Sequence, residues 1–204
     1  MTRIAIVYHS GAGNTATIAE AIADGAQLNE QVIVDVHQLT GSQIIDGRWQ
    51  DDDMMTALTD SDAIIFGSPT YMGMVSGVFK CFADATAPHW FQQTWKDKIA
   101  GGFTASGYAS GDKVMTLHYL ATLAAQLRML WVGTQAPPSN VTGDEQDIDR
   151  WGYYIGVGAV GSMNPELNLP DAGDILTARL YGERIAMVTE RWVRAQVALQ
   201  AEMK

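Results

Sequence analysis

Five short apolar runs alternate with longer segments of helical periodicity along the 204 residues. The runs are Ile4–Tyr8, Val32–Val36, Ala63–Gly67, Lys98–Ala105 and Leu130–Gln135. Continuous apolar runs are typical of strands buried on both faces, and β-α alternation implies a parallel sheet that is covered by helices. We therefore expect an α/β three-layer sandwich, in which a five-stranded parallel sheet of order 2-1-3-4-5 carries helices on both faces.

The segments between the runs predict the helices and the domain organisation. Apolar side chains return at helical spacing after the first run, and Asp171 is placed to cap a final helix. The stretch 136–170 holds proline, glycine and acidic residues and exceeds an ordinary connection, so we expect an irregular excursion after the fifth strand. The length favours a single domain over residues 1–204.

Charge and cysteine content narrow the class of protein. The formal net charge is −10, and a surface of that sign repels phosphate backbones and anionic lipid. We therefore expect neither nucleic-acid binding nor membrane insertion, and no apolar run approaches the roughly 18 residues of a membrane helix. The single cysteine, Cys81, excludes an internal disulfide and fits a cytoplasmic location. The first apolar run also ends too early for a secretory signal peptide.

The first strand leads into a turn of small and polar residues, namely Ser10, Gly11, Ala12, Gly13, Asn14 and Thr15. Glycines admit a ligand close to the backbone, and free N–H groups at a helix start attract an anion. A nucleoside-triphosphate loop would need lysine where Asn14 stands. Gly11-x-Gly13-x-x-Ala16 fits a dinucleotide fingerprint, but the second strand run lacks the expected acid at its end. A terminal phosphate monoester held by neutral donors fits best, and a tight turn without a ligand is the alternative.

The loops after the third and fourth strands carry aromatic, hydroxyl and thioether side chains. The second loop comprises Pro69, Thr70, Tyr71, Met72 and Gly73, and the third comprises Thr104, Ala105, Ser106, Gly107 and Tyr108. In such a sheet the ligand lies beyond the carboxyl ends of the strands, so the three loops should converge. Aromatic and thioether groups suit a flat conjugated ring. Together with the phosphate turn, they predict flavin mononucleotide (FMN).

Two longer motifs carry a family resemblance. "GSPTYMGMVSGVFKCFAD" and "FTASGYASGDKVMTLHYLATLA" contain the second and third loops, and "ARLYGERIA" lies in the last helix. They resemble the flavodoxin-like superfamily, and most closely the tryptophan-repressor-binding-protein type of NAD(P)H:quinone oxidoreductase. The resemblance implies that Ser10 to Thr15 hold the FMN phosphate. It also implies that Pro69 to Gly73 and Thr104 to Gly107 line the rest of the cofactor, with Tyr108 beside them.

The resemblance further implies an activity. Two electrons would pass as hydride from NAD(P)H to the flavin and then to a quinone-type acceptor, in a ping-pong scheme within a homo-oligomer. The cofactor carries the redox chemistry, so we assign no catalytic side chain and no metal. A one-electron carrier of flavodoxin type and a flavin-binding regulator without turnover are the alternatives.

The remaining candidate residues have structural interpretations. Cys81 lies among apolar residues at helical spacing, and we interpret it as a buried hydrophobe. Asp51-Asp52-Asp53 suits the start of a helix better than a metal site. Acidic residues between Asp144 and Asp149 are expected to lie in a solvated loop, and we expect the nearby Trp151, Tyr153 and Tyr154 to contact another subunit. His9 is expected to pack beneath the first loop, and His118 to lie on the surface.

Overall fold

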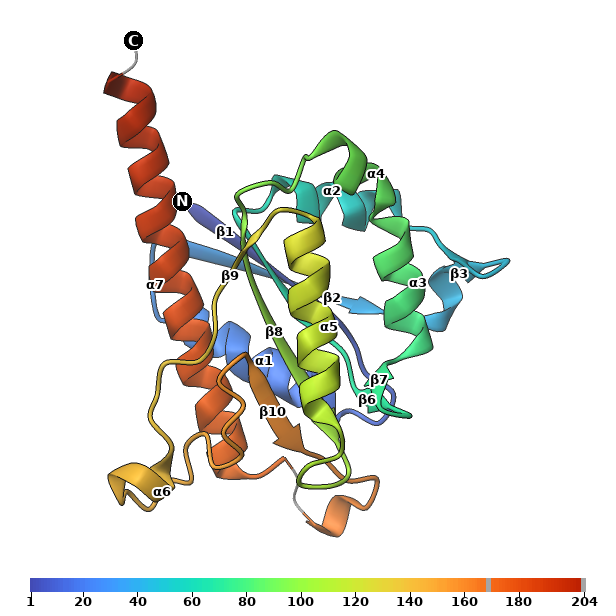
Figure 1. Ribbon diagram of the computed structural model, residues 1–204, viewed down its shortest axis with the longest axis vertical. Coiled ribbons are helices and arrows are strands. Elements are labelled where there is room, and N and C mark those ends of the chain that lie inside the picture. The colour runs from blue at the N-terminus through green and yellow to red at the C-terminus, as the bar shows by residue number, and fades with distance from the viewer. Residues whose placement is uncertain (168–169, 203–204) are drawn as a thin grey trace.

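The computed structural model describes residues 1–167 and 170–202, and a parallel sheet forms its centre (Figure 1). The strand order is β10-β8-β5-β1-β2. These strands span Thr2–His9 (β1), Val32–Leu39 (β2), Ala63–Gly67 (β5), Ile99–Ser106 (β8) and Val157–Val160 (β10). Counted along the chain, this order is 2-1-3-4-5, so the predicted α/β topology is confirmed.

The edge strand beside β8 differs from the prediction. The run Leu130–Gln135 supplies only β9 (Leu130–Trp131), which pairs with the start of β8, whereas β10 pairs with the other half of β8. The chain leaves the sheet because the backbone N–H of Thr134 donates to the carbonyl oxygen of Tyr154, at 3.0 Å, and not to β8. The stretch 136–170 was expected to be irregular. It contains β10, the short helix α6 (Ser139–Thr142) and a 3-10 turn at Pro165–Leu167.

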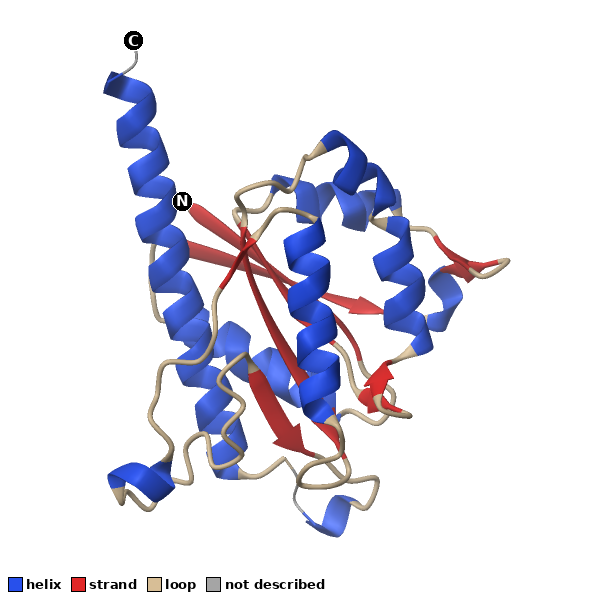
Figure 2. Cartoon of the chain, viewed as in Figure 1, coloured by secondary structure: helices blue, strands red, loops and turns tan. Residues whose placement is uncertain are grey.

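Helices cover both faces of the sheet (Figure 2). One face buries α1 (Asn14–Gln27) and α7 (Ala172–Glu202), with Ile18, Ile22 and Ile185 in the shared core. The other face buries α2 (Asp52–Asp60), α3 (Gly77–Ala85) and α5 (Lys113–Gln126), with Leu58, Phe79 and Leu120 in a second core. The helix α4 (Ala87–Gln92) follows α3 directly. Asp171 caps α7 as predicted, because its carboxylate accepts the backbone N–H of Asp174 at 3.0 Å.

Two glycines set the distance between α1 and α7. A Cβ atom on Gly182 would lie 1.9 Å from the carbonyl oxygen of Ile22, and one on Gly25 would lie 1.9 Å from that of Arg179. The helices can approach this closely only because both positions lack a side chain. The C-terminal turns of α7 extend beyond the sheet (Figure 1).

Two small hairpins and a 3-10 turn at Gly41–Gln43 complete the described elements. Ile44–Ile45 (β3) pairs with Arg48–Trp49 (β4), and Thr70–Tyr71 (β6) pairs with Met74–Val75 (β7). Within the described part of the chain, no helix combines the length and the apolar character that crossing a membrane requires.

Candidate flavin site

The first predicted loop joins β1 to α1 at the carboxyl edge of the sheet. Its N-cap is Gly13, which has a φ of +89° and no side chain to cap the helix. The hydroxyl of Ser10 accepts the backbone N–H of Ala16 at 3.3 Å. The start of a 14-residue helix therefore faces this loop with backbone N–H groups in its first turn, which suits an anion.

The side chain of Asn14 bonds to a segment that is distant in the sequence. Its amide donates to the carbonyl oxygen of Ser162 at 3.1 Å and accepts the backbone N–H of Ser162 at 3.2 Å. A Cβ atom on Gly161 would lie 2.5 Å from the Asn14 side chain. Asn14 therefore ties the first loop to the segment after β10, and it also lines the cavity described below.

Tyr71 lies against the first loop. A Cβ atom on Gly11 would lie 2.3 Å from the Tyr71 hydroxyl, which explains why position 11 is glycine. The Tyr71 ring also meets the ring of His9 edge-on, with 6.3 Å between the centroids. Burial lowers the pKa of His9, so its imidazole is neutral at pH 7 and brings no positive charge to the loop. His9 packs beneath the loop, as expected.

The second predicted loop is a tight hairpin. Met72 and Gly73 form its two-residue turn at φ +50° and +82°, the geometry that the twist of paired strands favours. Positive φ strains a methionine backbone, and the Met72 side chain is fully exposed. The hairpin therefore presents Met72 outward, beside the half-exposed Tyr71.

Thr70 and Thr104 point inward. The Thr70 hydroxyl lies 2.8 Å from the hydroxyl of Thr104 and 2.8 Å from that of Thr116 on α5, and all three side chains are buried. These bonds join the second loop, the end of β8 and α5 beneath the site. The Thr70 and Thr104 hydroxyls therefore each have a partner inside the protein, while Thr70 also lines the cavity described next.

A cavity of about 240 Å³ lies where the three loops converge. Ten of the sixteen predicted residues line it: Gly11, Ala12, Asn14, Thr15, Pro69, Thr70, Tyr71, Ala105, Ser106 and Gly107. Ser10, Gly13, Met72, Gly73, Thr104 and Tyr108 do not line it, although Met72 and Tyr108 are exposed on adjoining loop positions. The convergence of the loops is therefore as predicted.

A fourth segment, which sequence reasoning missed, closes the cavity. Gly161, Ser162 and Met163 line it directly after β10, and the Met163 side chain is 90% exposed. A signal was present, because Gly161-Ser162 follows the apolar run at Val157–Val160 just as the other loops follow their strands. Assigning the fifth strand to Leu130–Gln135 concealed it.

Two of the three aromatic residues before β10, Trp151 and Tyr153, are half-buried and bond within the chain. The Trp151 indole N–H donates to the carboxylate of Asp174 at 2.9 Å, and the Tyr153 hydroxyl donates to the carbonyl oxygen of Ser110 at 2.9 Å. Only Tyr154 is strongly exposed, at 63%. Of the three aromatic residues expected to contact another subunit, Tyr154 therefore offers the most exposed surface. Asp149, expected in solvent, is buried, and burial raises its pKa to about 6.

The other singled-out residues have the structural roles expected of them. Asp51 caps α2, because its carboxylate accepts the backbone N–H of Met54 at 2.9 Å. Cys81 is partly buried and packs against the core of the second face. His118 is exposed on α5.

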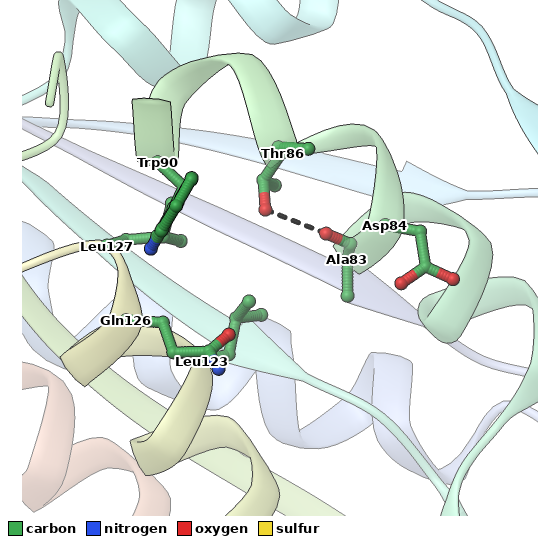
Figure 3. Close-up of a pocket in the computed structure, with 8 residues that line it drawn as sticks. Ala83, Asp84, Thr86, Trp90, Leu123, Gln126 and Leu127 are labelled. Atoms are coloured by element: carbon green, nitrogen blue, oxygen red, sulfur yellow. Dashed lines mark hydrogen bonds between the residues drawn. The ribbon is translucent and has the colours of Figure 1, made fainter. Parts of the chain in front are cut away.

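A second cavity, of about 280 Å³, lies at the opposite end of the sheet (Figure 3). Trp90, Leu123 and Gln126 line it between α4 and the C-terminal end of α5. The Thr86 hydroxyl at the end of α3 donates to the carbonyl oxygen of Ala83 at 2.7 Å. None of the three predicted loops reaches this cavity.

Comparison with known proteins identifies the family. Residues 2–142 match the NADPH-dependent FMN reductase family, which is more than half of the chain. The chain belongs to this family. Membership confirms the predicted class, an FMN-dependent oxidoreductase that takes electrons from a reduced nicotinamide nucleotide.

Relatives cover nearly the whole chain. FldP, a flavodoxin of Pseudomonas aeruginosa, is 34% identical over 192 residues, which are 94% of this chain and 98% of FldP. An NAD(P)H dehydrogenase (quinone) of Archaeoglobus fulgidus is 30% identical over 204 residues, with 94% and 99% covered. The crystal structure of a WrbA-like flavodoxin from Agrobacterium tumefaciens has a TM-score of 0.71 and 39% identity, with 94% and 99% covered. The predicted flavodoxin-like resemblance is therefore confirmed.

Proposed function

We propose that the cavity binds FMN and that the protein passes two electrons from NAD(P)H to a quinone-type acceptor. One observation carries the proposal: the start of α1, with glycine as its N-cap, opens where the three loops converge. Bound FMN would supply the ring that accepts hydride and returns electrons. The backbone N–H groups of Ser10 to Thr15 bind its phosphate in this proposal.

The internal hydrogen bonds of the second and third loops limit which of their groups would contact FMN. Because the hydroxyls of Thr70 and Thr104 have internal partners, Pro69 to Gly73 and Thr104 to Tyr108 would contact the ring and its side chain through backbone groups and through Tyr71, Met72 and Tyr108. Asn14 would act indirectly by holding Gly161–Met163 in the wall. A neutral His9 leaves the phosphate to backbone dipoles.

An open rim supports exchange of donor and acceptor at one site. Met72, Tyr108 and Met163 are each at least 80% exposed around the cavity. Apolar, polarisable side chains of this kind suit flat conjugated substrates such as a nicotinamide or a quinone. The name of the Archaeoglobus relative, an NAD(P)H dehydrogenase (quinone), supports the choice of acceptor. We include in this proposal the ping-pong order, in which donor and acceptor occupy the cavity in turn.

An anaerobic absorbance titration of the FMN-loaded protein tests the activity. We expect NADH or NADPH to bleach the visible flavin band in one two-electron step, and benzoquinone to restore it. Riboflavin, which lacks the phosphate, serves as the matched ligand and should bind at least 100-fold more weakly than FMN. Equal binding of the two would contradict the phosphate assignment.

A flavodoxin-type electron carrier is the second candidate, because FldP is 34% identical over nearly its whole length. In that case neither nicotinamide would bleach the band, and dithionite would reduce the flavin in two separate one-electron steps. Tight FMN binding with neither behaviour would instead indicate a flavin-binding regulator.

Assembly and location complete the proposal. We infer a homo-oligomer in the cytoplasm, for which the exposed Tyr154 and Val141 provide apolar contact surface. Light scattering of the FMN-loaded protein should give a multiple of 22.1 kDa, the mass of one chain. A mass of one chain at micromolar concentration would contradict the oligomer.

A further inference from the structure

The third loop has little packing of its own. It leaves β8 after Ser106, and residues 107–110 are exposed. Gly111 and Asp112 both have positive φ, at +50° and +54°, as the chain turns into α5. The carbonyl groups of such a loop would be free to reorient unless something holds them.

Lys113 holds the loop from beneath. It is the first residue of α5 and has no exposed surface. Its ammonium group donates to the carbonyl oxygen of Tyr108, and to that of Ala109 at 3.0 Å. A lysine is almost never fully buried without a partner, and here the partners are backbone carbonyls of the exposed loop.

Other side chains add to the support, among them the Ser106 hydroxyl, which donates to the carbonyl oxygen of Tyr108 at 3.3 Å. The Tyr153 hydroxyl donates to the carbonyl oxygens of Ala109 and Ser110, at 3.2 and 2.9 Å. Asp174 attracts the Lys113 ammonium, and its carboxylate accepts the backbone N–H of Val160 at 2.9 Å. Val160 directly precedes the wall segment Gly161–Met163. Lys113 therefore bonds the residues that follow the lining segment Ala105–Gly107, and Asp174 bonds the residue that precedes the lining segment Gly161–Met163.

We propose that Lys113 is a positioning residue, which fixes the backbone of Tyr108 and Ala109 in the shape that the flavin site requires. The proposal rests on the proposed function, because it assumes that FMN occupies the cavity. Lys113 does not line the cavity, so it acts through the loop and not by contact with the cofactor.

The energetics favour this role over a purely structural one. Burial lowers the pKa of Lys113 to about 8, from 10.5, so burying the charged ammonium opposes folding at neutral pH. Because the native state releases this proton first, the free energy of unfolding rises as the pH rises from about 8 to 10.5. A lysine that opposes folding at neutral pH, yet bonds the loop beside the cavity, fits a functional role better than a stabilising one.

The substitution Lys113→Met distinguishes a positioning role in FMN binding from a purely structural role. Lys80→Met is the matched control. Lys80 is half-exposed on α3, where it pairs with Asp84. We expect Lys113→Met to raise the dissociation constant of FMN about tenfold, the factor for one lost charge-assisted hydrogen bond. Amide hydrogen exchange at residues 113 and 115, whose N–H groups donate to the loop carbonyls of Ser110 and Asp112, should become faster in FMN-free protein, while urea unfolding shows equal or greater stability. Lys80→Met should change neither FMN binding nor this exchange.

The pH dependence of FMN binding provides a second test, because a residue that only packs would not change it. FMN binding by the wild type should weaken between pH 7 and 9.5, as Lys113 loses its proton, and Lys113→Met should remove this step. Asp174, Tyr153, Asp112 and the Tyr108 phenol are charged or titratable groups around Lys113 and its loop. Burial raises the pKa of Tyr153, so it stays protonated over this range, and Tyr153→Phe should keep the step.

The outcomes distinguish this inference from the proposed function. Unchanged FMN binding and unchanged exchange in Lys113→Met would overturn the role of Lys113. Failure of the wild type to bind FMN would overturn the proposed function instead, while the exchange of FMN-free protein would still test the loop. If Lys113→Met does not fold, Lys113→Gln, which keeps a neutral donor, replaces it with the same expected directions.

Discussion

At the level of single residues, three charged side chains are buried, and two of them, Lys113 and Asp174, bond segments that adjoin the cavity. Lys113, Asp149 and Asp174 are each at most 5% exposed. Lys113 and Asp174 have hydrogen-bond partners, whereas one carboxylate oxygen of Asp149 is buried without a partner among the described residues. An unpaired buried carboxylate opposes folding, so Asp149 is the residue whose removal should stabilise the protein most directly.

Asp149→Asn should therefore stabilise the protein at neutral pH. The native pKa of about 6 exceeds the ordinary 3.8, so between these values the unfolded chain loses its proton first and stability falls as pH rises. We expect Asp149→Asn to remove this fall and to raise the free energy of unfolding at pH 7 by about 1–3 kcal/mol, measured in urea. Asp147→Asn, also at positive φ but exposed, should leave the pH profile unchanged. An equal profile for wild type and Asp149→Asn would contradict the assignment.

At the level of elements, sequence periodicity predicted most of the fold. β5 begins and ends as predicted, β1 and β2 extend the predicted runs by up to three residues, and β8 is shifted by one residue. The agreement arises because continuous apolar runs mark strands buried on both faces. The fifth strand was wrong because two runs, Leu130–Gln135 and Val157–Val160, compete for one edge. Only pairing along β8 divides that edge between them, and a local pattern does not contain this information.

The contact between α1 and α7 gives a prediction at this scale. Gly182→Ala would place a methyl group 1.9 Å from the backbone oxygen of Ile22, so the two helices must separate. We expect a loss of about 2–4 kcal/mol in the free energy of unfolding, measured in urea on FMN-free protein. Gly77→Ala is the matched control at the start of α3, where no atom lies within 4 Å of the added methyl group. It should stabilise the protein by up to about 1 kcal/mol. Equal effects of the two substitutions would show that the close approach is not required.

At the level of the whole molecule, the site joins four loops that are distant in sequence. Three could be predicted, because each follows an apolar run and carries glycine, hydroxyl or aromatic residues. The inward hydroxyl of Thr70 and the bonds from Asn14 to Ser162 could not be predicted from the sequence, because their partners lie 34 to 148 residues away. The loops that a ligand meets are thus marked in the sequence, whereas the bonds that shape them depend on the assembled fold.

The charge of the whole molecule gives the final prediction. The chain carries −10, and no lysine or arginine is found among the described residues that line the cavity. The anionic phosphate of FMN must therefore approach against net repulsion.

Raising the ionic strength from about 0.01 M to 1 M shortens the Debye length from about 30 Å to 3 Å. We expect the association rate of FMN with the cofactor-free protein to rise by roughly two- to tenfold, measured by stopped-flow quenching of flavin fluorescence. Uncharged riboflavin is the control and should show little dependence on salt. A rate for FMN that falls with salt would mean that a positive group guides the phosphate, contrary to a site built from backbone dipoles.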